Sequence, residues 1–253
     1  MTYLQAVFLG LIEGLTEFLP VSSTGHLILA SAWMGLQGEE VKTFEIVIQA
    51  GALLAVLGLY GRRLRSLPLL RNLAISFLPA GVAGLLLHRV IKEHLFGTHP
   101  VAWALAAGGL FMIGLDRRLR RRSRPPARDL DSLNAGEAFL IGLAQCLALW
   151  PGTSRAMVTI AAGLLLGLSA PAAALYSFLL ALPTLGAATL FDAAKNGGVL
   201  LQTVSPLALA AGFITSAATA ALAVKGFTAY LNNRGLAPFG WYRLILALAV
   251  FFT

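Results

Sequence analysis

The sequence predicts an all-α, polytopic membrane protein. Of its 253 residues, 58% are hydrophobic and only 12% are charged, and the mean hydropathy is +0.79. A soluble domain of this length carries about twice that share of charged residues. Apolar segments recur along the whole chain, and helices can cross lipid because they satisfy their own backbone hydrogen bonds. The single cysteine, Cys146, excludes an internal disulfide framework.

The first half of the chain begins with two short apolar stretches that are separated by a polar turn at Pro20. Non-helical backbone at membrane depth is tolerated only where it lines a protein cavity, so residues 1–36 are expected to form a re-entrant helical hairpin. Longer apolar segments then predict transmembrane helices, since about 20 apolar residues are needed to span a bilayer. The expected spans are 44–60, 72–90 and 100–115.

The second half has the same order of segments. A polar turn at Pro151 interrupts a second hairpin, 136–168, and three apolar segments follow it, at 171–191, 204–224 and 238–253. Three spans are an odd number, so the two halves must face opposite sides of the membrane. The chain is therefore predicted to be an inverted-topology repeat, with units 1–116 and 135–253 joined by a basic cytoplasmic linker, 117–134.

The two hairpins also resemble each other in sequence. Glu13 aligns with Gln145, and with one residue of slippage Pro20-Val-Ser-Ser23 overlays Pro151-Gly-Thr-Ser154. A chance match between two apolar, Leu- and Gly-rich stretches is the alternative. The repeated order of segments favours a true repeat.

Positive charge predicts the orientation. Thirteen Lys and Arg residues follow the first, third and fifth expected spans, whereas four lie at the opposite end. The positive-inside rule makes the thirteen-charge side cytoplasmic. The seven arginines between Arg117 and Arg128 are then a topological anchor, and no nucleic-acid partner is expected. The first hairpin opens outward and the second opens to the cytoplasm.

Glu13 and Glu17 are the first candidate functional residues. They are four residues apart, so on a helix they share one face and repel each other if both are ionised. Such a pair favours a bound divalent cation, or one protonated member suited to acid–base work. The alternative is a structural ion pair between one of them and Arg155.

The turn after Glu17 concentrates hydroxyl groups. Ser22, Ser23, Thr24 and His26 lead into an apolar helix, and a helix N-terminus attracts anions. Ser23 and His26 are three residues apart, which could place them on one face as nucleophile and base.

The second turn repeats this design with a cation. Gly152 lets the backbone approach a ligand, Thr153 and Ser154 offer hydrogen bonds, and Arg155 presents a planar fork suited to phosphate oxygens. Two carboxylates, hydroxyls, an imidazole and an arginine in apolar sequence indicate a membrane enzyme that acts on a lipid phosphate.

These motifs resemble those of the undecaprenyl-diphosphatase family, also called the bacitracin-resistance protein family. The first family motif is similar to Glu13-Gly-Leu-Thr-Glu17 and the turn that runs to His26. The second is similar to Pro151-Gly-Thr-Ser-Arg155-Ala-Met-Val-Thr159, with Ala156 where the family commonly has a serine. The order of segments agrees along essentially the whole chain.

The resemblance implies hydrolysis of undecaprenyl diphosphate to undecaprenyl phosphate and inorganic phosphate, which recycles the lipid carrier of cell-wall synthesis and confers bacitracin resistance. It implies a divalent cation, Mg²⁺ or Ca²⁺, held by Glu13 and Glu17, and a homodimer in the bacterial inner membrane with a site open to the periplasm. The residues expected to act in catalysis are Glu13, Glu17, Ser23, His26 and Arg155. Those expected to bind substrate are Ser22, Thr24, Gly152, Thr153, Ser154 and Thr159.

A secondary transporter or flippase for a lipid phosphate or another anion is the alternative function. Inverted repeats with broken helices at the midplane are the architecture of such transporters, and paired glutamates could carry protons. Phosphate release by the pure protein separates the two functions.

Overall fold

A computed structural model describes residues 1–95, 97–121, 128–231 and 234–253, and leaves out the side chains at 39, 88–89, 92–94, 192–193 and 195–202. The prediction of an all-α protein is confirmed for the described residues. Every regular element among them is a helix, apart from one isolated β-bridge between Arg128 and Leu168. Residues 122–127 of the expected linker lie outside the described residues.

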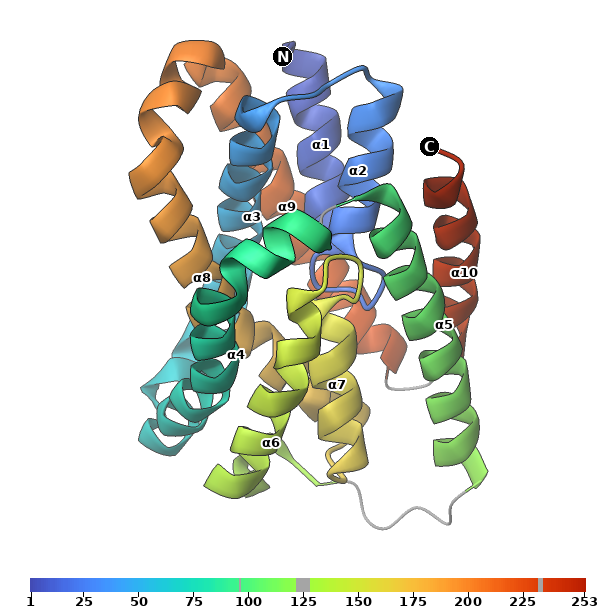
Figure 1. The fold of residues 1–253 in the computed structure, drawn as a ribbon. Coiled ribbons are helices and arrows are strands. Elements are labelled where there is room, and N and C mark those ends of the chain that lie inside the picture. The colour runs from blue at the N-terminus through green and yellow to red at the C-terminus, as the bar shows by residue number, and fades with distance from the viewer. Residues whose placement is uncertain (96, 122–127, 232–233) are drawn as a thin grey trace.

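Ten α-helices succeed one another in the described chain (Figure 1). They are α1 (Tyr3–Thr16), α2 (Ser23–Trp33), α3 (Glu39–Tyr60), α4 (Leu67–His94), α5 (Thr98–Arg121), α6 (Ala135–Gln145), α7 (Arg155–Leu165), α8 (Ala170–Thr203), α9 (Pro206–Leu231) and α10 (Ala237–Phe251). Three short 3₁₀ helices accompany them, namely η1 (Gly61–Arg65), η2 (Leu130–Ser132) and η3 (Cys146–Leu149).

Five of these helices are long and apolar enough to cross a membrane, and they match five of the six expected spans. Their apolar stretches are Glu40–Arg65, Leu67–Leu87, Thr98–Arg121, Ala170–Phe191 and Pro206–Leu231. The sixth expected span, 238–253, forms a helix that is shorter than these five. Its helix α10 has 15 residues, about 22 Å at 1.5 Å per residue, whereas the hydrocarbon core is about 30 Å thick.

The two broken segments form helical hairpins that approach each other from opposite ends of the molecule (Figure 1). Helix α1 begins, and α2 ends, at the end of the molecule that carries both chain termini. Helix α6 begins, and α7 ends, at the opposite end. With 14, 11, 11 and 11 residues, all four are too short to span a bilayer. Their connecting turns meet in the middle of the molecule, where an ion pair joins Arg155 to Glu17.

The hairpins correspond residue by residue at a constant separation of 132 positions. Thr2 and Asn134 each form a capping box, at α1 and α6. Ser22 and Ser154 are the N-caps of α2 and α7, and each has a φ of 72°. Gly35 and Gly167, with φ of 65° and 91°, follow the ends of these two helices.

The expected slippage of one residue between the turns is therefore wrong. The two prolines do not occupy equivalent positions, because Ser22 corresponds to Ser154 and Ser23 to Arg155. Shared proline and serine letters suggested a shifted alignment, but the cap geometry sets the true register. One turn consequently presents a hydroxyl where the other presents a guanidinium.

The two halves are interleaved in their packing. Helix α1 packs against α9 of the second half, and α6 packs against α4 of the first half; α5 and α10, and α3 and α8, also pair across the halves. Each hairpin thus buries its apolar face against the opposite half. Because the two halves pack against each other, helices of both halves enclose the two turns.

The arginine-rich segments gather at one end of the molecule. Helix η1, the end of α5 and the segment after residue 128 lie there, opposite the chain termini (Figure 1). An ion pair of 4.0 Å joins Arg63 to Asp131. Arg128 pairs with Glu137 at 2.6 Å, and its backbone bonds to Gly167 and Ser169 tie this segment to the turn between α7 and α8.

Candidate active site

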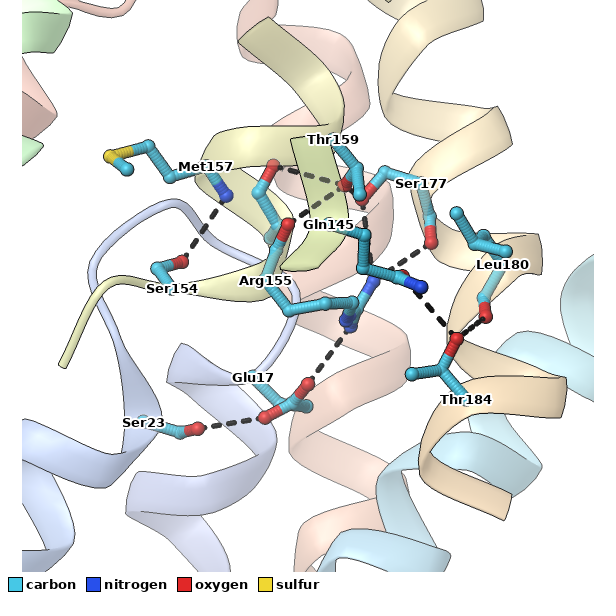
Figure 2. A network of polar contacts seen from close by, with 11 residues as sticks. Glu17, Ser23, Gln145, Ser154, Arg155, Met157, Thr159, Ser177, Leu180 and Thr184 are labelled. Carbon is cyan, nitrogen blue, oxygen red and sulfur yellow. Dashed lines mark hydrogen bonds and ion pairs between the residues drawn. The ribbon is translucent and has the colours of Figure 1, made fainter. Parts of the chain in front are cut away.

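The site is built on the first residues of two helices. Helix α2 begins at Ser23 and α7 begins at Arg155, and the two helices start on opposite sides of Glu17 (Figure 2). Each preceding serine adopts a positive φ and accepts a hydrogen bond from the backbone, Ser22 from Gly25 and Ser154 from Met157. These two hydroxyls, expected to bind substrate, therefore act as helix caps. Two helix N-termini in one place favour an anion.

Glu17 joins the two turns. Its Oε2 accepts a 2.7 Å hydrogen bond from Ser23 Oγ, and its Oε1 accepts a 2.9 Å hydrogen bond from Arg155 Nη2. The Glu17 and Arg155 side chains are only 6% and 7% exposed, so little water competes for them. The ion pair with Arg155, which the sequence left open as an alternative, is therefore present. Because the same carboxylate also accepts a hydrogen bond from the Ser23 hydroxyl, this ion pair lies within the candidate site.

Arg155 is anchored on its other side by α8. Its Nη1 donates to the backbone oxygen of Ser177 at 2.8 Å and to Ser177 Oγ at 3.3 Å, and its Cζ lies 5.6 Å from the centre of the Phe18 ring. Thr159 Oγ1 lies 2.7 Å from Ser177 Oγ and donates to the Arg155 carbonyl (Figure 2). Thr159, expected to bind substrate, is 1% exposed and supports the arginine.

The structure contradicts the expected pairing of Ser23 with His26. The His26 Nδ1 lies 2.8 Å from the Ser22 carbonyl, which can only accept, so Nδ1 carries the hydrogen. The His26 Nε2 lies 2.7 Å from Tyr242 Oη, and the two rings stack. Both ring nitrogens are therefore occupied elsewhere, and the acceptor that faces the Ser23 hydroxyl is Glu17. Three-residue spacing placed both side chains on α2 but could not fix their directions.

The surroundings of the Glu13 carboxylate are unusual for an acidic side chain. Glu13 is completely buried, and among the described residues neither carboxylate oxygen has a hydrogen-bond partner. Its electrostatic neighbours are Glu17, Glu45 and Gln49. An isolated buried carboxylate costs several kcal/mol unless it is protonated or paired with a cation.

The carboxylates of Glu13 and Glu17 can supply some of the ligands that a divalent cation needs, but not all of them. Within the described chain, no three His, Cys, Asp or Glu side chains are close enough to hold a metal by themselves. Mg²⁺ is commonly held by one or two carboxylates together with substrate phosphates. The orphaned oxygens of Glu13, beside Glu17, suit that shared kind of coordination.

Three more of the expected substrate-binding residues lie in the two turns. Thr24 is half-buried in the first turn of α2, and Thr153 is half-buried in the second turn. Gly152 has a φ of 92°, and a Cβ there would lie 2.6 Å from the Val101 carbonyl oxygen. This position therefore needs glycine for the close approach of α5.

Three residues that shape the site were not among those expected from the sequence, namely Ser177, Tyr242 and Arg243. Ser177 could have been found from the repeat, because it lies 132 positions after Glu45. Arg243 is a charged residue in an apolar segment, which is itself a signal of function, and it is 0% exposed. Tyr242 carried no signal, since an aromatic residue near a helix start is ordinary in a membrane protein.

A family model, described as bacitracin resistance protein BacA, matches residues 6–249. The chain belongs to the BacA family. Three curated relatives agree. The chain is 52% identical to undecaprenyl-diphosphatase of Sorangium cellulosum, over 99% of this chain and 86% of that protein. It is 45% identical to undecaprenyl-diphosphatase 2 of Rhodospirillum rubrum, over 99% and 94% of the two chains.

The third of these relatives is the undecaprenyl-diphosphatase of Maridesulfovibrio salexigens, which is 44% identical over 98% of this chain and 97% of that protein. These matches cover both turns and every described helix. The expected resemblance to this family is confirmed, and the chain is a multi-pass membrane protein of a bacterial family.

Proposed function

We propose that this chain hydrolyses undecaprenyl diphosphate to undecaprenyl phosphate and inorganic phosphate. The observation that carries the proposal is the contact of Glu17 with both Ser23 and Arg155, between the N-termini of α2 and α7. A hydroxyl, its proton acceptor and a guanidinium thus converge where two helix dipoles favour a diphosphate. The names of the relatives supply the substrate.

In the proposed reaction, substrate phosphate oxygens take over Arg155 Nη2 from Glu17, because a guanidinium fork binds phosphate as well as carboxylate. Glu17 then accepts the Ser23 proton while Ser23 Oγ attacks the terminal phosphorus. The bond from that phosphorus to the bridging oxygen breaks, and undecaprenyl phosphate leaves with the proton. Water cleaves the phosphoserine, which restores the hydroxyl and releases phosphate.

Glu13 and Glu17 would hold the divalent cation together with the diphosphate oxygens. When bound, a divalent cation neutralises charge that develops on the phosphoryl oxygens. Because Glu13 is buried, a negative charge on its carboxylate is stable only when a cation or a proton neutralises it. Mg²⁺ and Ca²⁺ are the two candidates.

The reaction is proposed to take place on the periplasmic side. The hairpin that carries Glu17 and Ser23 opens at the end opposite the arginine clusters (Figure 1), and the positive-inside rule assigns those clusters to the cytoplasm. The lipid tail would lie in the bilayer while the diphosphate reaches the buried turns. A homodimer and the absence of a nucleic-acid partner stay predictions.

Phosphate release from undecaprenyl diphosphate by the purified protein in detergent tests the proposal. Stoichiometric phosphate and undecaprenyl phosphate are expected, and a chelator should stop their release. An acid quench followed by mass spectrometry should find phosphate on Ser23 during turnover. A transporter has no reason to cleave its cargo, so binding without phosphate release would favour that alternative.

A further inference from the structure

Arg243, on α10, is a buried cation held by backbone carbonyls. It is 0% exposed, and in the described part of the chain its hydrogen bonds go to four carbonyl oxygens. Its Nη2 donates to Gly152 at 2.9 Å and to Ala104 at 3.0 Å. Its Nε donates to Leu105 at 3.3 Å, and its Nη1 to Pro20 at 3.4 Å. No ion pair to a carboxylate accompanies these bonds among the described residues.

Two of these carbonyls occupy equivalent positions in the two hairpins. Pro20 lies three residues before Ser23, and Gly152 lies three residues before Arg155, so both precede the first residue of a helix by the same distance. One guanidinium therefore binds the same point of both turns. The other two carbonyls fasten it to α5, a helix that belongs to neither hairpin.

The chemistry of this contact requires arginine. Carbonyl oxygens that converge on one point repel each other, and each is costly to bury without a donor. A planar guanidinium has five N–H donors in a rigid fork and can bridge acceptors on several segments at once. A lysine ammonium is a point charge on a flexible stem and cannot hold two turns at a set distance.

Gly108 on α5 makes room for the guanidinium. A Cβ at this position would contact Arg243 Nη2 and would lie 2.9 Å from both Arg243 Cζ and Met157 Sδ. The geometry points to Arg243 as a positioning residue: it fixes the two turns relative to each other, so that Ser23 and Arg155 both reach Glu17. This inference rests on the proposed hydrolysis.

The test compares Arg243→Lys and Gly108→Ala in the full-length protein, with radiolabelled undecaprenyl diphosphate as the probe. Gly108→Ala displaces the guanidinium without removing its charge. Each variant should lower kcat by about 10²-fold, as misplacement of catalytic groups by about 1 Å can do. Arg120→Lys is the matched control, because Arg120 bonds to Asp116 away from the turns, and it should hydrolyse like the wild type.

A double-mutant cycle separates positioning from mere folding. Arg243→Lys should cost a smaller factor in a Ser23→Ala background than in the wild type, because one of the two groups that it positions is gone. A loss of the same factor in both backgrounds would show a purely structural arginine. Wild-type turnover by Arg243→Lys and Gly108→Ala would equally overturn the inference. If the wild type itself releases no phosphate, the proposed function fails instead.

Discussion

Ser23 Oγ donates a 2.7 Å hydrogen bond to Glu17 Oε2, whereas His26 bonds to the Ser22 carbonyl and to Tyr242. Sequence spacing had suggested that the histidine serves the serine. The contact instead makes a carboxylate at the C-cap of α1 the proton acceptor for a hydroxyl on α2. Since Arg155 shares that carboxylate, the resting site already holds the three groups that the proposed reaction needs.

The first prediction compares the two candidate bases. Glu17→Gln should lower kcat by about 10²–10⁴-fold, the usual worth of a general base. His26→Gln should cost much less, because His26 does not face Ser23. Tyr242→Phe removes the same hydrogen bond from the other side and should match His26→Gln. A larger loss from His26→Gln than from Glu17→Gln would reverse the assignment.

The second prediction concerns Arg155. Arg155→Ala should reduce hydrolysis on the order of 10³-fold or more, as loss of an arginine that stabilises phosphoryl transfer does. Arg155→Lys should recover little, since an ammonium lacks the planar fork. Removing one partner of a buried pair also destabilises the fold, by about 3–5 kcal/mol.

The double variant Arg155→Ala, Glu17→Gln separates these two effects. It no longer contains an unpaired buried carboxylate, so its unfolding temperature should return toward that of the wild type while its activity stays low. Wild-type turnover by Arg155→Ala alone, measured at a temperature where that variant stays folded, would show that the arginine is only structural.

The third prediction concerns metal binding. Glu13→Gln should weaken the dependence of kcat on added Mg²⁺ or Ca²⁺, because the unpartnered oxygens of Glu13 are the best available ligands. Titration of each ion against phosphate release measures the shift, with Asp131→Asn as a control at an exposed carboxylate. An unchanged titration in Glu13→Gln would leave Glu13 a proton carrier.

The fourth prediction is a pH dependence of stability. The Arg128 hydrogen bond holds the pKa of Glu137 below its ordinary value of 4.5. A carboxylate whose pKa is lowered by folding stabilises the fold above that ordinary value, and the benefit is lost as the pH falls through the folded-state pKa.

Glu137→Gln should therefore lower the unfolding temperature at pH 7, and the difference from the wild type should close below about pH 4.5. A glutamine side chain can still accept the hydrogen bond from the backbone N–H of Asn134, so the substitution tests the loss of the charge. Added salt should shrink the effect, because Arg128 is partly exposed. A difference that is constant down to pH 3 would refute the linkage.

The fifth prediction concerns topology. In a Cys146→Ala background, Gln37→Cys should react with an impermeant maleimide added to intact cells, because Gln37 is exposed at the end opposite the arginines. Asp131→Cys should react only after the membrane is opened, since Asp131 lies beside Arg63 at the arginine-rich end. Labelling of Asp131→Cys from outside would remove the argument for a periplasmic site.

The sequence alone determined the fold class, the paired hairpins and most of the chemical groups, because apolar composition, helix length and intramembrane charge are local properties. Glu13, Glu17, Ser23 and Arg155 stand out by type and surroundings. Tertiary structure alone decided which groups touch. It set the register of the repeat, turned His26 toward Tyr242 and brought in Arg243 from a distant helix. Side-chain direction and the packing of opposite halves depend on contacts between segments more than 100 residues apart, and no local pattern in the chain encodes them.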